Sequence, residues 1–124
     1  VETRLIRPAH GPSLRVEDLA AAADARTRLV AVSFVDWQTG ARTDLAPLGA
    51  WCRERGIPFV VDGIQGVGAL RLDVEQSQVD VLAVGGHKWM LSLEGVGGLY
   101  VSRRVQDRIQ SVLHGWKSVT DCDT

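Results

Sequence analysis

The hydrophobic residues of this chain gather into four short runs that contain few polar positions. The runs are RLVAVSFV (28–35), IPFVVD (57–62), VDVLAV (79–84) and GGLYVS (97–102). A continuous apolar run of this length, bounded by polar residues or glycine, is typical of a strand that is covered on both faces. The pattern therefore predicts four buried strands.

Two segments between these runs have the composition of helices. RVEDLAAAADA (15–25) is rich in alanine and has acidic residues near its start, which favours a short helix. DLAPLGAWCRERG (44–56) offers Asp44 as an N-cap, Pro47 in the first turn and Gly56 as the stop. We expect a helix in each segment.

A third helix is predicted after the last apolar run. In RRVQDRIQSVL (103–113), helical spacing places Val105, Ile109 and either Val112 or Leu113 on one side. We expect such a helix to pack this apolar side against the sheet.

Strands that alternate with helices predict an α/β fold with a mostly parallel sheet flanked by helices. Only the connection at 70–78 is too short for more than one turn of helix. In such sheets, ligands bind at the carboxyl ends of the strands. Three of the predicted strands are followed there by polar tips, DWQTG (36–40), DGIQG (62–66) and GGHKW (85–89). We expect these tips to gather along a single edge of the sheet.

The overall composition is that of one globular domain. The chain has 124 residues, of which 45% are hydrophobic, and a formal net charge of -1. Such a balance, without runs of lysine or arginine, gives no reason to expect nucleic acid or a membrane as a partner. Cys52 and Cys122 do not form a disulfide framework, which favours a cytoplasmic setting. The chain begins at Val1 without a methionine, and we expect it to be a piece of a longer protein.

Asp62 ends an apolar strand, so its carboxylate is expected in a mostly apolar environment. A buried carboxylate is costly unless it has a cationic partner or a raised pKa. Gln65 follows three residues later and would lie on the same side of a helical turn. The glycines at 63, 66 and 68 leave room for a flat ligand or a close backbone. The alternative is an aspartate that only caps the next turn.

Lys88 comes directly after two glycines and His87. A lysine acts as a nucleophile when its amine loses its proton near neutral pH, which requires desolvation or a nearby cation. A strand-end position behind Gly85 and Gly86 offers both a low dielectric and access. His87 is suited to binding an anion such as phosphate. Taken alone, the two residues are better explained as a solvated lysine and a structural histidine.

A carboxylate on one strand tip and a lysine on a later one can together bracket a pyridine ring. The lysine would form a Schiff base with the aldehyde of pyridoxal 5'-phosphate (PLP), and the carboxylate would pair with the protonated ring nitrogen. Three stretches resemble the class V aminotransferases, a group of fold-type I PLP-dependent enzymes that includes cysteine desulfurases and isopenicillin-N-epimerase-like proteins. They are VSFVDWQTGARTDL (32–45), VVDGIQGVGALRLDV (60–74) and VDVLAVGGHKWMLSLEGVGGLYVS (79–102).

The resemblance assigns roles to individual residues. It implies that Lys88 is the Schiff-base lysine and that Asp62 is the partner of the pyridinium nitrogen. Gln65 would hydrogen-bond the ring oxygen of the cofactor, and His87 would contact its phosphate. The strand GGLYVS (97–102) would be the single antiparallel strand of the family. The implied enzyme acts on the α-amino group of an amino acid, with the released Lys88 amine moving the α-proton.

Two positions depart from the cysteine desulfurase pattern. Trp37 stands where those enzymes have an asparagine near the ring, and its indole would instead pack on the cofactor or line the substrate pocket. Gly85 stands where they have a serine, so one phosphate contact is lost. Both changes weaken desulfuration as the specific reaction, but neither weakens PLP binding.

Members of the family are much longer than this chain. The resemblance implies that 1–124 is a fragment of the PLP-binding large domain, without its N-terminal part and without the small C-terminal domain. The other parts would carry a phosphate-binding turn and the arginine that holds the substrate carboxylate. The resemblance also implies a homodimer in which the neighbouring subunit completes each site. We therefore expect the fragment alone to be inactive.

Two alternatives keep the fold and change the function. A noncatalytic binding domain with a degenerate PLP-transferase fold would retain Asp62 and Lys88 by descent. A nucleotide-binding module would use the glycines of GVGAL or GVGGLY, but neither fits GxGxxG and no GK[ST] is present.

Two further alternatives depend on isolated residues. A hydrolase would have to use Ser92 or Cys52, and neither lies in a nucleophile motif. A metal site would have to use His10, His87 and His114, which lack the spacing of ligands.

Overall fold

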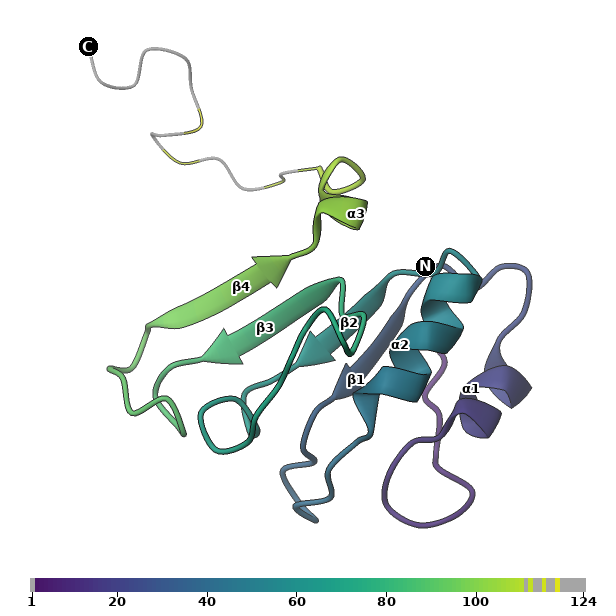
Figure 1. The fold of residues 1–124 in the computed structure, drawn as a ribbon, viewed down its shortest axis with the longest axis horizontal. Helices are drawn as coiled ribbons and strands as arrows, with labels where there is room; N and C mark the ends of the chain where they lie inside the picture. The colour runs from purple at the N-terminus through teal and green to yellow at the C-terminus, as the bar shows by residue number, and fades with distance from the viewer. Residues whose placement is uncertain (1, 111, 113–114, 116–117, 119–124) are drawn as a thin grey trace.

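The computed structural model describes residues 2–110, 112, 115 and 118, and the described residues form one four-stranded sheet (Figure 1). Its strands are β1 (Val30–Ser33), β2 (Phe59–Asp62), β3 (Val81–Gly85) and β4 (Gly97–Val101). They lie in the order β1-β2-β3-β4; the first three are parallel and β4 is antiparallel to β3. All four predicted strands form, and the predicted α/β fold with a mostly parallel sheet is confirmed.

The register brings the carboxyl ends of the parallel strands to one edge. Ser33 pairs with Asp62, and Asp62 pairs with Ala83, two residues before β3 ends. The tips that follow the three strands therefore leave the sheet along the same edge, as the sequence predicts. We call this the carboxyl edge.

Three helices accompany the sheet: α1 (Val16–Ala22), α2 (Leu45–Glu54) and α3 (Arg103–Gln106). Asp44 is the N-cap of α2, although its side chain makes no capping hydrogen bond. Leu48 and Cys52 of α2 share one buried core with Phe59 and Val61 of β2. The alternation of side chains along β2 aims these two strand residues at the helix.

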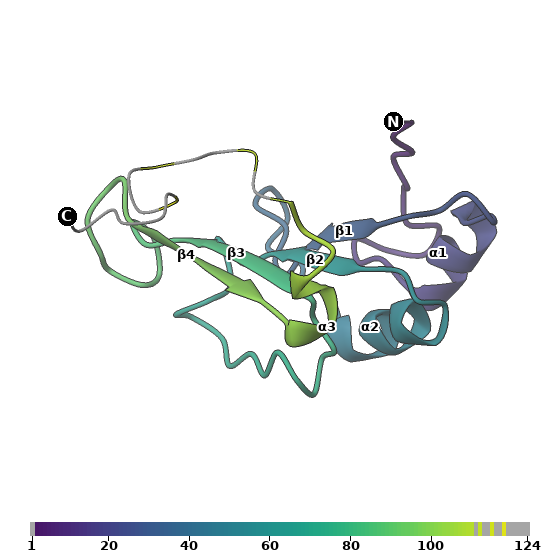
Figure 2. The ribbon, with the colours of Figure 1, turned by 90° about the horizontal axis from the view of Figure 1, so that it is seen from above.

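The prediction that the strands are covered on both faces is wrong for the described chain. Figure 2 shows α2 on one side of the sheet and no described helix on the other. The residues that alternate with the core positions point to this second side, and Leu99 there is 68% exposed. We call this side, with Ala31, Val60, Asp62, Val81 and Leu99, the open face.

The predicted helix over 103–113 is also wrong in length, because α3 ends at Gln106. Val105 is buried, but Ile109 and Val112 are 52% and 86% exposed. A short helix is marginal in water unless tertiary packing supports it, and the described part of the chain covers only about half of Ile109. Leu113 lies outside the described residues.

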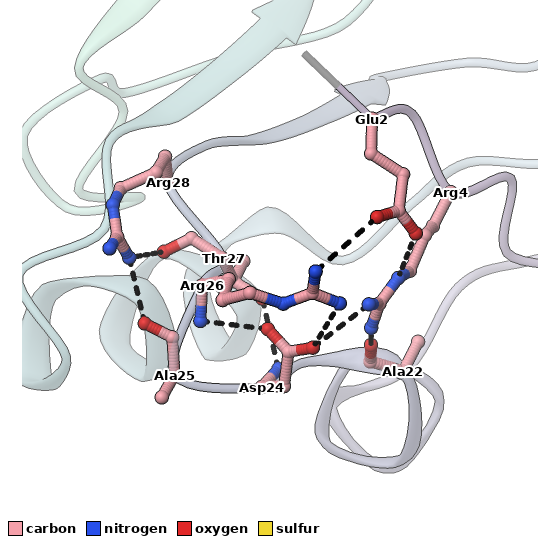
Figure 3. A network of polar contacts seen from close by, with 8 residues as sticks. All are labelled: Glu2, Arg4, Ala22, Asp24, Ala25, Arg26, Thr27 and Arg28. Carbon is pink, nitrogen blue, oxygen red and sulfur yellow. Dashed lines mark hydrogen bonds and ion pairs between the residues drawn. The ribbon is translucent and has the colours of Figure 1, made fainter.

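An ion-pair network attaches the N-terminal segment to the end of α1 (Figure 3). Arg4 pairs with Asp24 at 2.8 Å and with Glu2 at 3.2 Å, and it donates to the Ala22 carbonyl at 3.0 Å. Arg26 reaches both carboxylates, at 3.4 and 3.7 Å. Because these side chains are exposed, each pair stabilises the fold only slightly.

Candidate active site

The turn after β2 carries Asp62 and Gln65. The Asp62 carboxylate accepts a hydrogen bond from the Ile64 N–H at 2.9 Å. The Gly63 carbonyl accepts from Gly66 at 3.0 Å and from Val67 at 2.9 Å, which closes one helical turn. Asp62 thus caps its own turn, as the simpler interpretation of the sequence expected.

The environment of the Asp62 side chain differs from the predicted one. Its side chain is exposed rather than buried among apolar groups, and none of the ion pairs in the described part of the chain includes it. The reason is the register, which puts Asp62 on the open face beside Ser33. Ser33 was not singled out from the sequence; the signal was a polar residue inside an otherwise apolar run.

The loop after β3 carries His87 and Lys88. The Gly86 N–H donates to the Val96 carbonyl at 2.8 Å, and the Gly86 carbonyl accepts from Ser92 at 2.8 Å. The Leu91 N–H donates to the Lys88 carbonyl at 3.0 Å. We call 86–92 the lysine loop. Within it His87 is exposed and Lys88 is half-buried.

Glycine allows the lysine loop and the Asp62 turn to lie in contact. A Cβ on Gly85 would stand 2.9 Å from Ile64 Cδ1 and 3.1 Å from His87 Cε1, which is closer than side chains pack. Serine at position 85 would therefore require Ile64 or His87 to move. Glycine at position 85, where the desulfurase pattern has serine, therefore fits the close packing of Ile64 and His87.

Trp37 lies at the tip of a hairpin that follows β1. The hairpin closes through a bridge between Val35 and Arg42. Asp36 orders the tip, because its carboxylate accepts from the hydroxyl and the N–H of Thr39, both at 2.8 Å. These two bonds lower the pKa of Asp36. The Trp37 side chain is 74% exposed.

The five predicted site residues therefore lie at or just beyond the ends of parallel strands and share the carboxyl edge. They are Trp37, Asp62, Gln65, His87 and Lys88. They do not line either of two hollows on the described surface. One hollow, of about 400 Å³, lies beside Trp51 and Arg55; the other, of about 520 Å³, lies beside Arg42 and Arg71. Trp37, Asp62 and His87 are exposed, whereas Gln65 and Lys88 are half-buried.

The isolated residues considered for other functions occupy other positions. Cys52 is 0% exposed, and burial, followed by the charge of Asp80, raises the pKa of its thiol to about 11, as suits the predicted core residue. His10 lies in an irregular segment, whereas His114 lies outside the described residues. Among the residues that the structure describes, no group of three or more His, Cys, Asp or Glu is placed to hold a metal ion. GVGG leads into β4, as predicted.

The described helices include none with the length and apolar composition to cross a membrane.

The described chain is thus an α/β domain whose mostly parallel sheet carries a carboxylate turn and a lysine loop in contact at its carboxyl edge. The family model described as "Aminotransferase class-V" matches residues 1–124. The chain belongs to this family, as the resemblance of its motifs predicted.

Curated relatives include cysteine desulfurases. IscS from Shewanella baltica (strain OS223) and IscS from Escherichia coli (strain K12 / DH10B) are each 36% identical over 114 residues. Each alignment covers 92% of this chain and 28% of the relative. The chain thus spans little more than a quarter of the length of the relatives it matches.

Solved structures agree with this family. The apo cysteine desulfurase from Thermococcus onnurineus NA1 superposes with a TM-score of 0.80 at 28% identity, covering 90% of this chain and 28% of that one. The cystine C-S lyase C-DES, in complex with cysteine persulfide, gives 0.79 at 38% identity over 84% of this chain and 28% of that one. A C-DES variant with the same coverage has glycine covalently linked to its PLP cofactor.

Proposed function

We propose that the protein containing this chain is a PLP-dependent enzyme of the class V aminotransferase type that acts on the α-amino group of an amino acid. The observation that carries the proposal is the contact between the Asp62 turn and the lysine loop at the carboxyl edge of parallel strands. The relatives support it, because they include cysteine desulfurases, a cystine C-S lyase and a structure with a PLP cofactor.

The residues at the carboxyl edge fit PLP in their chemistry. Lys88 supplies a primary amine, and Asp62 supplies a carboxylate that is not engaged by any cation in the described part of the chain. When bound, PLP supplies an electron sink for the charge left on the substrate carbon. Asp62 would hold a proton on the ring nitrogen, and Lys88 would hold the cofactor through its Nζ atom.

The remaining residues have binding roles in this proposal. Gln65 would donate to the ring oxygen, and His87 would contact the phosphate. The exposed indole of Trp37 would pack on the cofactor or line the substrate pocket. Lys88 Nζ would act as the general base that moves the α-proton of the substrate.

The chain would be one part of a PLP-binding large domain and would be inactive by itself. The open face supports this proposal, because apolar side chains such as Leu99 are normally covered in a complete domain. Substrate-side residues elsewhere in the protein would set the reaction type among transamination, desulfuration, lyase cleavage and epimerisation. We further propose a cytoplasmic homodimer whose neighbouring subunit completes the site, which size-exclusion chromatography with light scattering tests.

Cofactor attachment is the experiment that tests the function. PLP is added to the full-length protein, the visible absorbance is recorded, and the sample is reduced with borohydride and mapped by peptide mass spectrometry. We expect a stable band and a label on Lys88. Lys88→Ala should lose both, whereas Lys117→Ala, which changes the only other lysine of the chain, should keep both.

The role of Asp62 is tested with Asp62→Asn. We expect weaker PLP binding and α-proton exchange that is slower by about 100-fold or more, since the ring nitrogen loses its anionic partner. Near-normal turnover in Asp62→Asn would contradict the role. If the full-length protein gave no band at all, the noncatalytic binding domain would replace the enzyme proposal.

A further inference from the structure

Gly68 is the point where the turn after Asp62 meets the lysine loop. Its φ of +98° lies in the region that favours glycine. A Cβ at this position would stand 2.5 Å from the carbonyl oxygen of Trp89 and 2.9 Å from the N atom of Met90. Ordinary contacts begin near 3.4 Å, so a side chain would push the Trp89 carbonyl away by about 0.9 Å. Because both atoms are backbone, no rotamer change relieves the overlap.

Hydrogen bonds would pass this displacement on to Lys88. Trp89 follows Lys88 directly, and the Lys88 carbonyl accepts from Leu91 at 3.0 Å. The Gly86 carbonyl accepts from Ser92 at 2.8 Å, which closes the loop around them. Leu91 also has a φ of +53°, so the loop already carries backbone strain and has little freedom to adjust.

The Asp62 side of the contact is equally constrained. The Gly66 carbonyl accepts from Ala69 at 3.1 Å and from Leu70 at 2.8 Å, so Gly68 lies inside a second closed turn. This turn continues directly from the one that Asp62 caps. The contact at Gly68 therefore sets how far the Asp62 turn lies from the lysine loop.

We propose that Gly68 is a positioning residue, whose missing side chain fixes Lys88 relative to Asp62. For its effect on cofactor chemistry, the inference rests on the proposed function. Misplacing a reacting group by about 1 Å can cost about 100-fold in rate, and the displacement expected here is of that order.

The test compares Gly68→Ala with Gly56→Ala in the full-length protein. Gly56 also has a positive φ, +65°, but no atom lies within 4 Å of its Cβ position. Both variants force alanine into a conformation it disfavours, but only Gly68→Ala places a Cβ against the lysine loop. Without PLP, we expect amide hydrogen exchange at Leu91 and Ser92 to be about 10-fold faster in Gly68→Ala alone.

With PLP, Gly68→Ala should bind the cofactor about 10-fold more weakly and turn over about 100-fold more slowly, whereas Gly56→Ala should change either by less than about 2-fold. If the alanine variants do not fold, Gly68→Asn and Gly56→Asn replace them. Asparagine tolerates a positive φ better, and it keeps the overlap with Trp89.

Two results would overturn the positioning role. One is equal behaviour of the two variants in exchange and in PLP affinity. The other is faster exchange throughout β2 and β3, which would indicate general unfolding instead of a local displacement. A wild-type protein that binds no PLP would refute the proposed function, while the exchange measurement would still decide whether Gly68 holds the lysine loop.

Discussion

Asp80 and Arg104 form a buried ion pair whose loss should destabilise the whole sheet. Asp80 is 0% exposed and accepts hydrogen bonds from the Phe59 N–H at 2.9 Å, the Ser102 hydroxyl at 2.9 Å and Arg104 Nε at 2.8 Å. Arg104 Nη2 is a further donor to it. The pair joins β2, β3, β4 and α3 at the end of the sheet opposite the candidate site.

The perturbation is Arg104→Met, which keeps an apolar stem and removes the guanidinium. It leaves the Asp80 carboxylate buried without a counter-charge. Breaking a buried pair in this way costs about 3–5 kcal/mol. Arg104 is 24% exposed on its side chain, which favours the lower end, about 3 kcal/mol. A loss of that size raises the opened population about 100-fold.

Cys52 provides the assay, since it is fully buried and reacts only when the core opens. The rate of its alkylation, followed by mass spectrometry of its peptide, should rise about 100-fold in Arg104→Met. Arg103→Met is the matched control, because Arg103 is exposed and forms none of the ion pairs in the described part of the chain. It should leave the rate within about 2-fold of wild type.

A double variant identifies the cause of the destabilisation. Adding Asp80→Asn to Arg104→Met removes the unpaired charge, so the double variant should be more stable than Arg104→Met alone. If Arg104→Met reacted at the wild-type rate, or if the double variant lost stability additively, the reasoning about the buried charge would be wrong.

The acid sensitivity of the pair follows from its pKa. Burial by itself raises the pKa of Asp80, but the hydrogen bonds from Arg104, Phe59 and Ser102 outweigh burial and lower it. A carboxyl group with a lowered folded-state pKa stabilises the fold above its unfolded value near 3.8, and this contribution is lost as the pH falls through the folded value. The difference in the free energy of unfolding between wild type and Asp80→Asn should therefore shrink below about pH 4.

Two further predictions concern packing and the hairpin. In Gly49→Ala, the new Cβ would overlap the carbonyl oxygen of Ser77, a backbone atom against which α2 packs. Thermal denaturation should show a loss of about 1–3 kcal/mol, and an unchanged midpoint would argue against close packing there. Asp36→Ala should speed amide exchange at Thr39 relative to wild type, because the carboxylate that orders the hairpin tip is removed. Since those bonds lower the pKa of Asp36, exchange in the wild type should also increase once the pH falls through that lowered value, below 3.8. Exchange that stays at its pH 7 level throughout the acid titration, after correction for intrinsic rates, would refute this role.

Local sequence was sufficient for the strands and for the residues at their tips. The apolar runs predicted every start and end of β1 to β4 to within two residues, because burial demands apolar side chains wherever the chain crosses the core. The alternation of strands and helices favoured a mostly parallel sheet, and parallel pairing of β2 with β3 places Asp62 and Lys88 at one edge, although no helix separates these two strands. This much follows from periodicity and chain connectivity alone.

The tertiary structure decided which partners lie across from one another. The exposure of Asp62 depends on what covers the open face. The apolar run that ends at Asp62 carries no information on this, because the same run would form β2 with or without a helix on that face. The short α3 has the same cause, since Ile109 has helical spacing but remains half exposed in the described chain. In both cases the missing information is a non-local contact.

The contacts that fix the site belong to this second kind. Sequence suggested that Gly68 leaves room for a close backbone, but only the fold identifies that backbone as Trp89, 21 positions away in the chain. Asp80 likewise stands in an apolar run with no sequence signal that Arg104 is its partner. Periodicity fixes which side of an element a residue occupies, whereas the identity of its neighbour depends on how separate elements pack.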